Sequence, residues 1–169
     1  MAWKRLLVPH DFSACASQAL ALAADLAELH GARIVVIHAS ELPENLEPST
    51  VIQPPGAAIP MRADEYTTRG ARARLDDLLA PLRARGLDVR AMAVLGEVPS
   101  TILEAIASTN ADAVVMGTHG RKGLSHLLLG SIAEKIVRHA TVPVVTTRLP
   151  GPEVAHTAEE RALEDELAG

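Results

Sequence analysis

Aromatic side chains are almost absent from this chain of 169 residues. Trp3, Phe12 and Tyr66 are the only three, and aromatics make up 2% of the sequence, whereas apolar residues make up 48%. Proteins that bind single-stranded nucleic acids stack the bases on several aromatic rings, and this chain has too few rings for such a surface. The hydrophobic core must instead be built from alanine, leucine, valine and isoleucine.

Positive charge is also scarce. The chain has 16 lysines and arginines against 21 aspartates and glutamates, which gives a net charge of −5. A protein that holds nucleic acid through its phosphates needs a basic surface. No nucleic acid is therefore expected among its partners.

The single cysteine, Cys15, and the lack of long apolar runs exclude further classes. One cysteine cannot form an internal disulfide, and no CxxC pair indicates a zinc or redox site. Cys15 has small apolar neighbours and is interpreted as an inert thiol, with a reactive thiol early in a helix as the alternative. No segment approaches the roughly 20 apolar residues that span a bilayer, and no signal peptide is recognised. We expect a cytoplasmic protein without a membrane span.

Short apolar runs alternate with segments of helical periodicity. The run RIVVIHA at residues 33–39 is continuous rather than alternating, which is typical of a strand covered on both faces. The predicted strands are residues 4–8, 33–39, 88–95, 111–116 and 142–147, and the predicted helices are residues 14–30, 62–85, 100–108 and 131–139. Strands that alternate with helices form parallel, doubly wound sheets. We expect an α/β fold with helices on both faces of one open sheet.

Two segments fall outside this alternation. Residues 40–60 contain five prolines without periodicity, which predicts an exposed and partly mobile loop. Residues 151–169 are acidic and have few apolar side chains, which predicts a marginal helix or a disordered tail. The chain is therefore divided into one domain at residues 1–150 and an acidic tail. Within the helix at 62–85, Pro81 is expected to kink or shorten the last turn.

Irregular turns follow the first and fourth predicted strands. In an open α/β sheet, ligands bind beyond the carboxyl ends of the strands, where the strand order reverses. If these strands are neighbours, residues 9–11 (Pro-His-Asp) face residues 116–120 (Met-Gly-Thr-His-Gly). Gly117 and Gly120 permit a positive φ and the close approach of a ligand. Residues 130–131 (Gly-Ser) offer N–H groups and a hydroxyl at a helix start, which suits a phosphate chain.

Structural explanations for the same residues stay open. Gly117 and Gly120 can be simple turn formers, and Asp11 can cap the helix that begins near Ser13. Nucleotide binding is favoured because one ligand explains both turns and the helix start together.

The spacing of the glycines is a more specific signal. Two residues separate Gly117 from Gly120, and nine more precede Gly130 and Ser131, which gives the pattern G-2x-G-9x-G-[S/T]. With this spacing, the chain resembles the ATP-binding members of the universal stress protein family. The resemblance covers about residues 2–148. Its segments are VPHDFS at 8–13, VVIHA ending at 39, GEVPSTI at 96–102, VVMGTHGRKGLSHLLLGS at 114–131 and VPVV at 142–145.

The resemblance implies a Rossmann-like fold of five strands in the order 3-2-1-4-5 and a homodimer formed through the edge strand at residues 142–147. It also implies a bound ATP, ADP or AMP, with or without Mg²⁺ held through the phosphates. Asp11 is implied to lie near the nucleoside and the backbone of Ala39 at the adenine edge. Family members often have valine in place of Ala39, a difference that a backbone contact tolerates. The implied nucleotide-binding residues are Pro9, His10, Asp11, Ala39, Met116, Gly117, His119, Gly120, Gly130, Ser131 and Ile132.

A metal site held by the protein alone is the less favoured interpretation of the histidines. His10, His38 and His119 all lie at predicted carboxyl ends of strands, but nothing in their spacing guarantees a common centre. No residue is assigned as a metal ligand or a catalytic group. Arg121 and Lys122 are interpreted as a solvated loop rather than as phosphate ligands.

Three functions are carried forward. The chain lacks GxxxxGK[ST], GxGxxG and GxSxG motifs, which disfavours P-loop NTPases, dinucleotide dehydrogenases and α/β-hydrolases. The favoured hypothesis is a dimeric switch whose ATP orders residues 117–130 and 40–60 and so changes the surface offered to an unidentified regulatory partner. A slow ATP hydrolase or phosphotransferase and a nucleotide-free dimeric scaffold are the alternatives.

Overall fold

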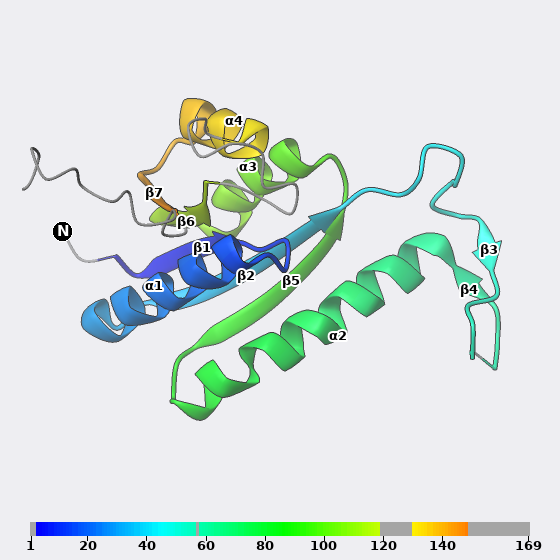
Figure 1. Cartoon of the computed structure of the whole chain (residues 1–169), viewed down its shortest axis with the longest axis horizontal. Coiled ribbons are helices and arrows are strands. Elements are labelled where there is room, and N and C mark those ends of the chain that lie inside the picture. Colours follow the sequence, from blue (N-terminus) through cyan, green and yellow to red (C-terminus); the bar gives the residue numbers. More distant parts are fainter. Residues whose placement is uncertain (1–2, 57, 119–129, 149–169) are drawn as a thin grey trace, which may run out of the picture.

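A central parallel sheet organises the chain in the computed structural model, which describes residues 3–56, 58–118 and 130–148 (Figure 1). The strands are β1 (Arg5–Pro9), β2 (Arg33–Ser40), β3 (Val51–Ile52), β4 (Met61–Arg62), β5 (Val89–Leu95), β6 (Ala113–Gly117) and β7 (Val144–Thr147). The helices are α1 (Ala14–His30), α2 (Ala63–Ala84), α3 (Val98–Thr109) and α4 (Ser131–His139).

Five of the strands pair in the order β5-β2-β1-β6-β7, and every pair is parallel. In the numbering of the predicted strands this is the order 3-2-1-4-5, so both the α/β class and the expected strand order are confirmed. The order reverses at β1, whose neighbours are β2 and β6. The carboxyl ends of β1 and β6 therefore lie side by side at the switch point where a ligand site is expected.

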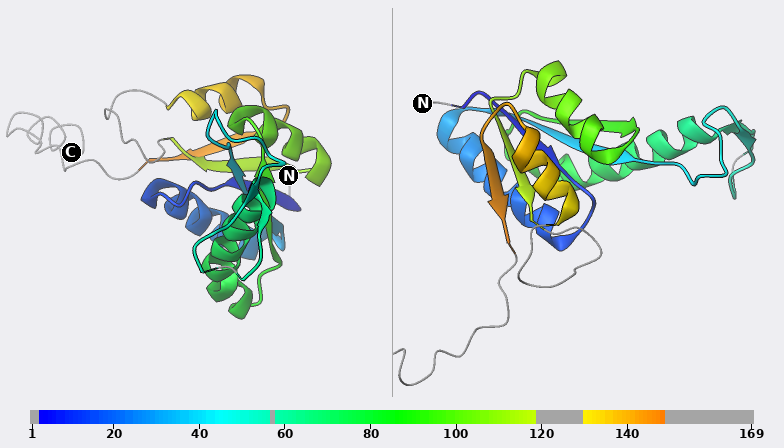
Figure 2. Two further views of the ribbon diagram at one scale, coloured as in Figure 1. Left: turned by 90° about the vertical axis from the view of Figure 1, so that its right-hand side faces the viewer. Right: turned by 90° about the horizontal axis from the view of Figure 1, so that it is seen from above.

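Helices cover both faces of the sheet, α1 and α2 on one side and α3 and α4 on the other (Figures 1 and 2). The sheet has a hydrophobic core on each face, and successive residues of β1 point alternately into the two cores. Leu6 and Val8 join a cluster with Leu75 and Leu79 of α2, and Leu7 joins a cluster on the other face that includes Ile102 of α3. All of the strand residues involved are fully buried, which explains the continuous apolar runs in the sequence.

Helix α1 has the boundaries that its sequence predicts. The Ser13 hydroxyl accepts a hydrogen bond from the Ala16 N–H at 3.2 Å, and Gly31 ends the helix with φ 63°. Its buried face is mostly alanine, which allows the helix axis to lie close to the sheet. The buried residues of α1 are Cys15, Ala16, Ala19, Leu20, Ala23, Ala24 and Ala27.

The proline-rich segment differs from the loop that the sequence predicts. Val51 and Ile52 pair antiparallel with Arg62 and Met61 as the two-residue strands β3 and β4. The Ala63 and Asp64 N–H groups donate to the Thr50 and Pro48 carbonyls at 2.9 and 3.1 Å, which ties the hairpin to the start of α2. The prolines prevent a longer strand but permit this short ladder, because Val51 and Ile52 lie between Pro48 and Pro54, and Met61 and Arg62 follow Pro60.

Pro81 does not end α2. The helix continues to Ala84, three residues beyond the proline. The terminal Arg85 N–H bonds the Pro81 and Leu82 carbonyls, so the last turn closes around the ring. The expectation that Pro81 shortens the helix is therefore wrong. The helix ends close to where the sequence predicts, just before Gly86.

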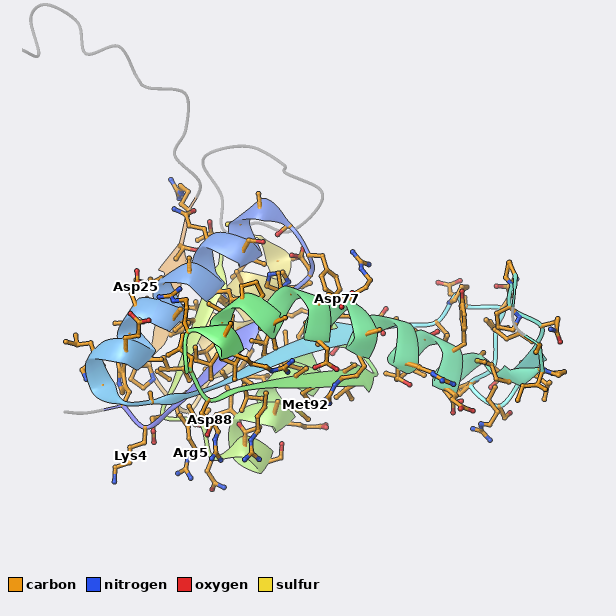
Figure 3. The ribbon with its side chains drawn as sticks, turned by 90° about the horizontal axis from the view of Figure 1, so that it is seen from below. Lys4, Arg5, Asp25, Asp77, Asp88 and Met92 are labelled. Carbon is orange, nitrogen blue, oxygen red and sulfur yellow. The ribbon has the colours of Figure 1, made fainter. Side chains whose placement is uncertain are left out.

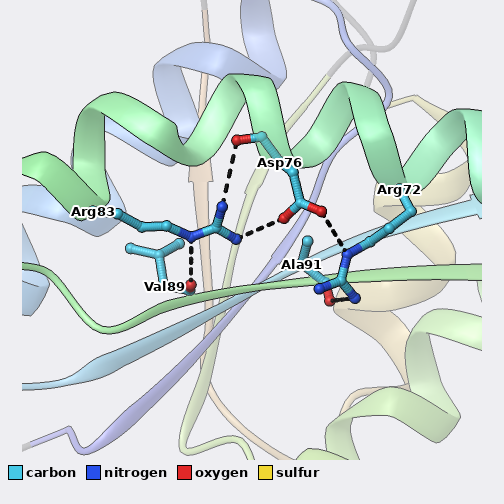
Figure 4. A network of polar contacts seen from close by, with 5 residues as sticks. All are labelled: Arg72, Asp76, Arg83, Val89 and Ala91. Carbon is cyan, nitrogen blue, oxygen red and sulfur yellow. Dashed lines mark hydrogen bonds and ion pairs between the residues drawn. The ribbon is translucent and has the colours of Figure 1, made fainter.

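Two arginines of α2 fasten the helix to the edge of the sheet (Figure 4). Arg72 donates to the Ala91 carbonyl at 2.7 Å, and Arg83 donates to the Val89 carbonyl at 3.2 Å. Asp76 lies between them and accepts from both guanidinium groups, at 2.9 and 2.8 Å. These contacts satisfy backbone carbonyls that an edge strand would otherwise expose.

The acidic tail at 151–169 and the loop at 119–129 lie outside the described residues. Within the described segments, no helix combines the length and hydropathy that a membrane crossing requires.

Candidate functional site

The candidate site lies at the carboxyl edge of the sheet, where β1, β2 and β6 end. β1 stops at Pro9, which is opposite Ile37, while β2 continues for three more residues to Ser40. The chain turns away after Pro9, and the His10 N–H donates to the Ile37 carbonyl at 2.8 Å as the last bond between the two strands. The end of β2 therefore extends past its neighbour.

Because of this offset, Ala39 has no paired residue on β1. Groups on one strand alternate in direction, and the Ile37 carbonyl points toward β1 while the Ser40 carbonyl points toward β5 and accepts from the Gly96 N–H. Ala39 therefore directs its N–H and C=O toward the side on which β1 has already ended. The His10 carbonyl, just beyond the end of β1, accepts a hydrogen bond from His38 Nδ1 at 2.7 Å.

The turn after β1 is held by its own side chains. Asp11 Oδ1 accepts from the Ser13 N–H at 3.0 Å, and Phe12 adopts a left-handed backbone with φ 64°. The N-cap of α1 is Ser13, so Asp11 does not cap the helix as the structural alternative expects. Asp11 instead closes the turn that precedes the cap. Its Oδ1 contact leaves the nucleotide hypothesis for Asp11 open.

His10 is buried and neutral in this turn. Nδ1 accepts from the Phe12 N–H at 3.0 Å, which places the ring proton on Nε2. Among the described residues, Nε2 has no hydrogen-bond partner. Burial lowers the pKa of His10 to about 4; Asp11 opposes this shift, while His38 and Arg74 add to it.

Phe12 connects the turn to helix α2. The centroids of the Phe12 and His38 rings are 4.7 Å apart. The Cζ of Arg74 lies over the Phe12 ring, 3.9 Å from its centroid. Arg74 thereby brings a positive charge from the middle of α2 to the site. Sequence analysis missed this residue, because nothing in the helical pattern distinguishes Arg74 from the other arginines of α2.

Helix α4 begins at the same edge. The Gly130 N–H donates to the Thr118 carbonyl, and the Thr118 N–H donates to the Thr147 carbonyl, both at 2.8 Å. Thr118 therefore joins the ends of β6 and β7 to the start of α4. Gly130 is the N-cap and has no side chain to bond the N–H groups of the first turn, where Ser131 and Ile132 are exposed. The Gly130 N–H itself is occupied, which corrects the expectation that it is free.

Gly117 is required for packing rather than for a positive φ. Among the described glycines, only Gly31, Gly56 and Gly86 have positive φ. A Cβ at Gly117 would lie 2.7 Å from Cys15 Sγ and 3.0 Å from the Cys15 carbonyl carbon. Cys15 is buried and donates to the Thr147 carbonyl at 3.4 Å, as the inert-thiol interpretation predicts for a structural side chain. Gly117 therefore allows α1 to approach β6.

The structure brings together most of the predicted site residues. Pro9, His10 and Asp11 follow β1, Ala39 ends β2, Met116 and Gly117 end β6, and Gly130, Ser131 and Ile132 begin α4. Met116 is buried in the core beneath the edge, so its side chain packs against α3 and α4. The two remaining residues, His119 and Gly120, lie outside the described segments.

Protein ligands for a metal ion do not gather at this edge. In the part of the chain that the structure describes, no group of three or more histidine, cysteine, aspartate or glutamate side chains is placed to hold an ion. His10 Nδ1 and His38 Nδ1 are both engaged in hydrogen bonds. The third histidine of the metal hypothesis, His119, lies outside the described residues.

Comparison with known proteins identifies the family. The family model described as the universal stress protein family matches residues 2–148. The chain belongs to the universal stress protein family. It is 31% identical over 159 residues to a universal stress protein of Thermus aquaticus, covering 86% of this chain and 99% of that protein.

Solved universal stress proteins share this fold. The structure of MJ0577 superimposes with a TM-score of 0.70 at 20% identity and covers 90% of this chain and 100% of that one. MJ0577 is a universal stress protein of Methanocaldococcus jannaschii, 23% identical over 154 residues, with 86% of this chain and 95% of that protein covered. A universal stress protein in complex with cAMP and one from Archaeoglobus fulgidus in complex with dAMP have TM-scores of 0.62 and 0.60 at 20% and 22% identity. They cover 87% and 86% of this chain, and 98% of each of those chains.

The contact between Gly117 and Cys15 gives a testable prediction for this universal stress protein. Gly117→Ala should lower the free energy of unfolding by about 1–3 kcal/mol, because the new methyl group overlaps Cys15. Urea unfolding measures the loss. Adding Cys15→Ala should restore part of it, since Sγ is the nearest atom but the Cys15 backbone remains. An unchanged midpoint for Gly117→Ala would refute the packing role.

A second prediction concerns His10 and pH. An unfolded histidine binds its proton near pH 6.5, whereas His10 in the fold stays neutral down to about pH 4. Above pH 6.5, His10 is neutral in both states and does not lower the free energy of unfolding. As the pH falls from 6.5 toward 4, the unfolded state gains a proton that the folded state does not, and the free energy of unfolding falls by up to about 3 kcal/mol. Urea unfolding at pH 7, 5.5 and 4.5 should show this fall.

The control compares two histidine substitutions. His10→Asn keeps an acceptor for the Phe12 N–H but removes the titrating group, so its stability should fall less over the same pH range. His139→Asn changes an exposed histidine at the end of α4 and should retain the full pH dependence. Equal pH profiles for wild type and His10→Asn would contradict the assignment.

Proposed function

We propose that this chain binds an adenine nucleotide at the carboxyl edge of its sheet and acts as a nucleotide-dependent switch. The proposal rests on the backbone of Ala39, whose N–H and C=O are directed to the side of β2 on which β1 has ended. Adenine presents an acceptor, N1, beside a donor, its exocyclic amino group, and this pair is complementary to one residue's N–H and C=O. A backbone contact also explains why alanine serves as well as valine at this position.

The start of α4 supplies the complementary site for the phosphates. Three first-turn N–H groups follow Gly130 without a capping side chain, and they lie at the positive end of the helix dipole. The Ser131 hydroxyl is exposed beside them. We place Asp11 at the ribose between the two ends, and His119 and Gly120 around the ribose and phosphates.

The chemistry of the turn supports a bound ligand. His10 Nε2 is a buried donor with no partner among the described residues, and such a donor costs about 1–3 kcal/mol. A ligand acceptor would remove that cost. The two complexes with cAMP and dAMP show that relatives of this fold hold adenine nucleotides, which further supports the assignment.

Mg²⁺ enters the proposal only through the nucleotide. When bound, the ion would neutralise phosphate charge, with phosphate oxygens and water as its main ligands. This chain's residues then position the nucleotide and do not supply a metal cage of their own. We assign no catalytic base and propose that ATP is held rather than hydrolysed.

The nucleotide site is tested by a matched pair of substitutions. Ser131→Asp places a carboxylate at the start of α4, which stabilises the helix but repels phosphate. It should weaken ATP binding in calorimetry about tenfold or more, while Ser131→Asn, of the same size but neutral, should bind within a few fold of wild type. Equal affinities for all three proteins would show that the phosphates lie elsewhere.

The base site is tested in the same experiment. GTP should bind at least about tenfold more weakly than ATP, because guanine presents a donor at N1 and an acceptor at O6, the reverse of adenine.

Denaturation and chromatography should release the nucleotide that co-purifies, and incubation with ATP and Mg²⁺ should return ATP rather than ADP. A scaffold without nucleotide would show no binding, and accumulation of ADP would favour the hydrolase.

We further propose that the switch acts as a homodimer through β7, in a reducing compartment such as the cytoplasm. β7 is an edge strand whose Pro143 and Thr147 carbonyls point toward β6, so Val144 and Thr146 turn their N–H groups outward. Antiparallel pairing with a second β7 would satisfy these groups. The nucleotide would then alter the surface that this dimer presents to a protein partner.

Thr146→Pro tests the dimer without breaking a bond inside the chain. Proline removes the outward N–H and is tolerated on an edge strand. Sedimentation velocity should show a dimer weakened about tenfold or more, with an unchanged circular dichroism spectrum. Thr146→Val keeps the N–H and should leave the dimer intact. Equal dimer stability in both variants would place the interface elsewhere.

A further inference from the structure

A projecting arm is the largest feature that the nucleotide site does not use. We call residues 41–62 together with the first turns of α2, up to Arg72, the arm. Figures 1 and 2 show that β3 and β4 lie beyond the end of the sheet, at the start of α2, well away from the other helices. In Figure 3 they lie at the opposite end of α2 from Asp88, Lys4 and Arg5.

The arm exposes large apolar side chains. Val51 is 66% exposed, Ile59 70% and Tyr66 45%. A two-stranded hairpin is at best marginally stable in water unless its apolar face is covered. This hairpin is nevertheless held in place by the hydrogen bonds from Ala63 and Asp64 to the segment before β3. The apolar patch is therefore fixed in position at the end of a helix rather than carried on an unrestrained loop.

A groove beside the arm has an open sheet edge as its floor. The Asp88 carbonyl accepts from the Ile34 N–H of β2, so by alternation residues 89, 91 and 93 face outward from β5. Arginines of α2 cover the first two carbonyls, but among the described residues no side chain bonds the Ala93 carbonyl. A groove of about 430 Å³ opens at this point, lined by Glu65, Thr68, Arg69, Arg72 and Ala93.

The shape and chemistry of the groove suit an aliphatic side chain. Its lining combines a small apolar residue, Ala93, with the side chains of Arg69 and Arg72, whose hydrocarbon stems are apolar. The Arg72 guanidinium is held by the Ala91 carbonyl and Asp76. Ile59 and Val51 are aliphatic residues of a size that such a groove accepts.

The arm carries exposed charges of both signs that could pair with those of a second arm. Glu44 and Glu47 are exposed on the outgoing segment, and Arg69 is exposed on the returning helix. None of the three forms an ion pair with another described residue. In a twofold arrangement, each contact is made twice, so the acidic segment of one arm meets the arginine of the other.

We propose that two copies of this chain exchange arms, with Ile59 of each copy seated in the Ala93 groove of the other and Glu44 and Glu47 beside the partner's Arg69. A second copy is favoured over an unrelated partner because one arm carries both an apolar knob and a groove, and both signs of unpaired charge. The contact uses the β5 edge, at the opposite end of the sheet from β7.

Disulfide capture tests the contact directly. Two full-length chains with tags of different mass, one with Ile59→Cys and the other with Thr68→Cys, are mixed without nucleotide and oxidised. The expected product is a mixed disulfide dimer on a non-reducing gel. Leu29→Cys, 76% exposed on α1, replaces Ile59→Cys as the control and should give only background. The native Cys15 is buried and contributes equally to all samples. A yield no higher than the Leu29 control would overturn the proposal.

Charge reversal provides an independent readout. In sedimentation equilibrium on the Thr146→Pro background, which weakens the proposed β7 dimer, Ile59→Asp and Arg69→Glu should each weaken the arm contact about tenfold or more, and Leu29→Asp should not. Combining Arg69→Glu with Glu44→Arg and Glu47→Arg should restore association. Absence of rescue, or an Ile59→Asp protein that associates like wild type, would overturn the exchange of arms between two copies. Both results are independent of ATP affinity, so they separate this proposal from the nucleotide site.

Discussion

The early end of β1 is the constraint on which the candidate site depends. Because the chain turns at Pro9 while β2 continues to Ser40, a parallel ladder stops with one strand still extended. His38 Nδ1 then donates to the His10 carbonyl, which holds the turn after β1 against β2. By strand alternation, the N–H and C=O of Ala39 are directed to the side on which β1 has ended. Functional groups of this kind do not depend on side-chain identity.

The rest of the edge is organised by close approach and shared hydrogen bonds. Gly117 lets α1 pack against the end of β6, and Thr118 links β6, β7 and α4 through its two backbone groups. Helix α4 therefore starts at a fixed position relative to the sheet, with its uncapped first turn beside the ends of β6 and β7. Buried His10 and the Phe12 turn complete this wall, and the pKa shift of His10 follows from its burial there.

The arm follows a different physical logic. The body of the protein buries its apolar residues in two cores, one on each face of the sheet. The arm has no second layer of its own, so Val51 and Ile59 stay exposed unless another surface covers them. Arg72 and Arg83 protect most of the β5 edge, and the unprotected part coincides with the groove beside the arm. Helix α2 therefore covers part of the β5 edge with its arginines and also contributes to the groove beside the uncovered part.

The sequence by itself determined the class of fold and the position of most elements, because continuous apolar runs and helical periodicity are local consequences of burial on two faces. The glycine spacing also predicted which turns would form the site, and that assignment remains a proposal. Only the tertiary structure decided that Gly117 faces Cys15 and that Arg74 reaches Phe12, because these contacts join segments that meet only after the sheet has assembled. The pairing of residues 51–52 with 61–62 is local, but the prolines around it hide the alternation by which a strand is recognised.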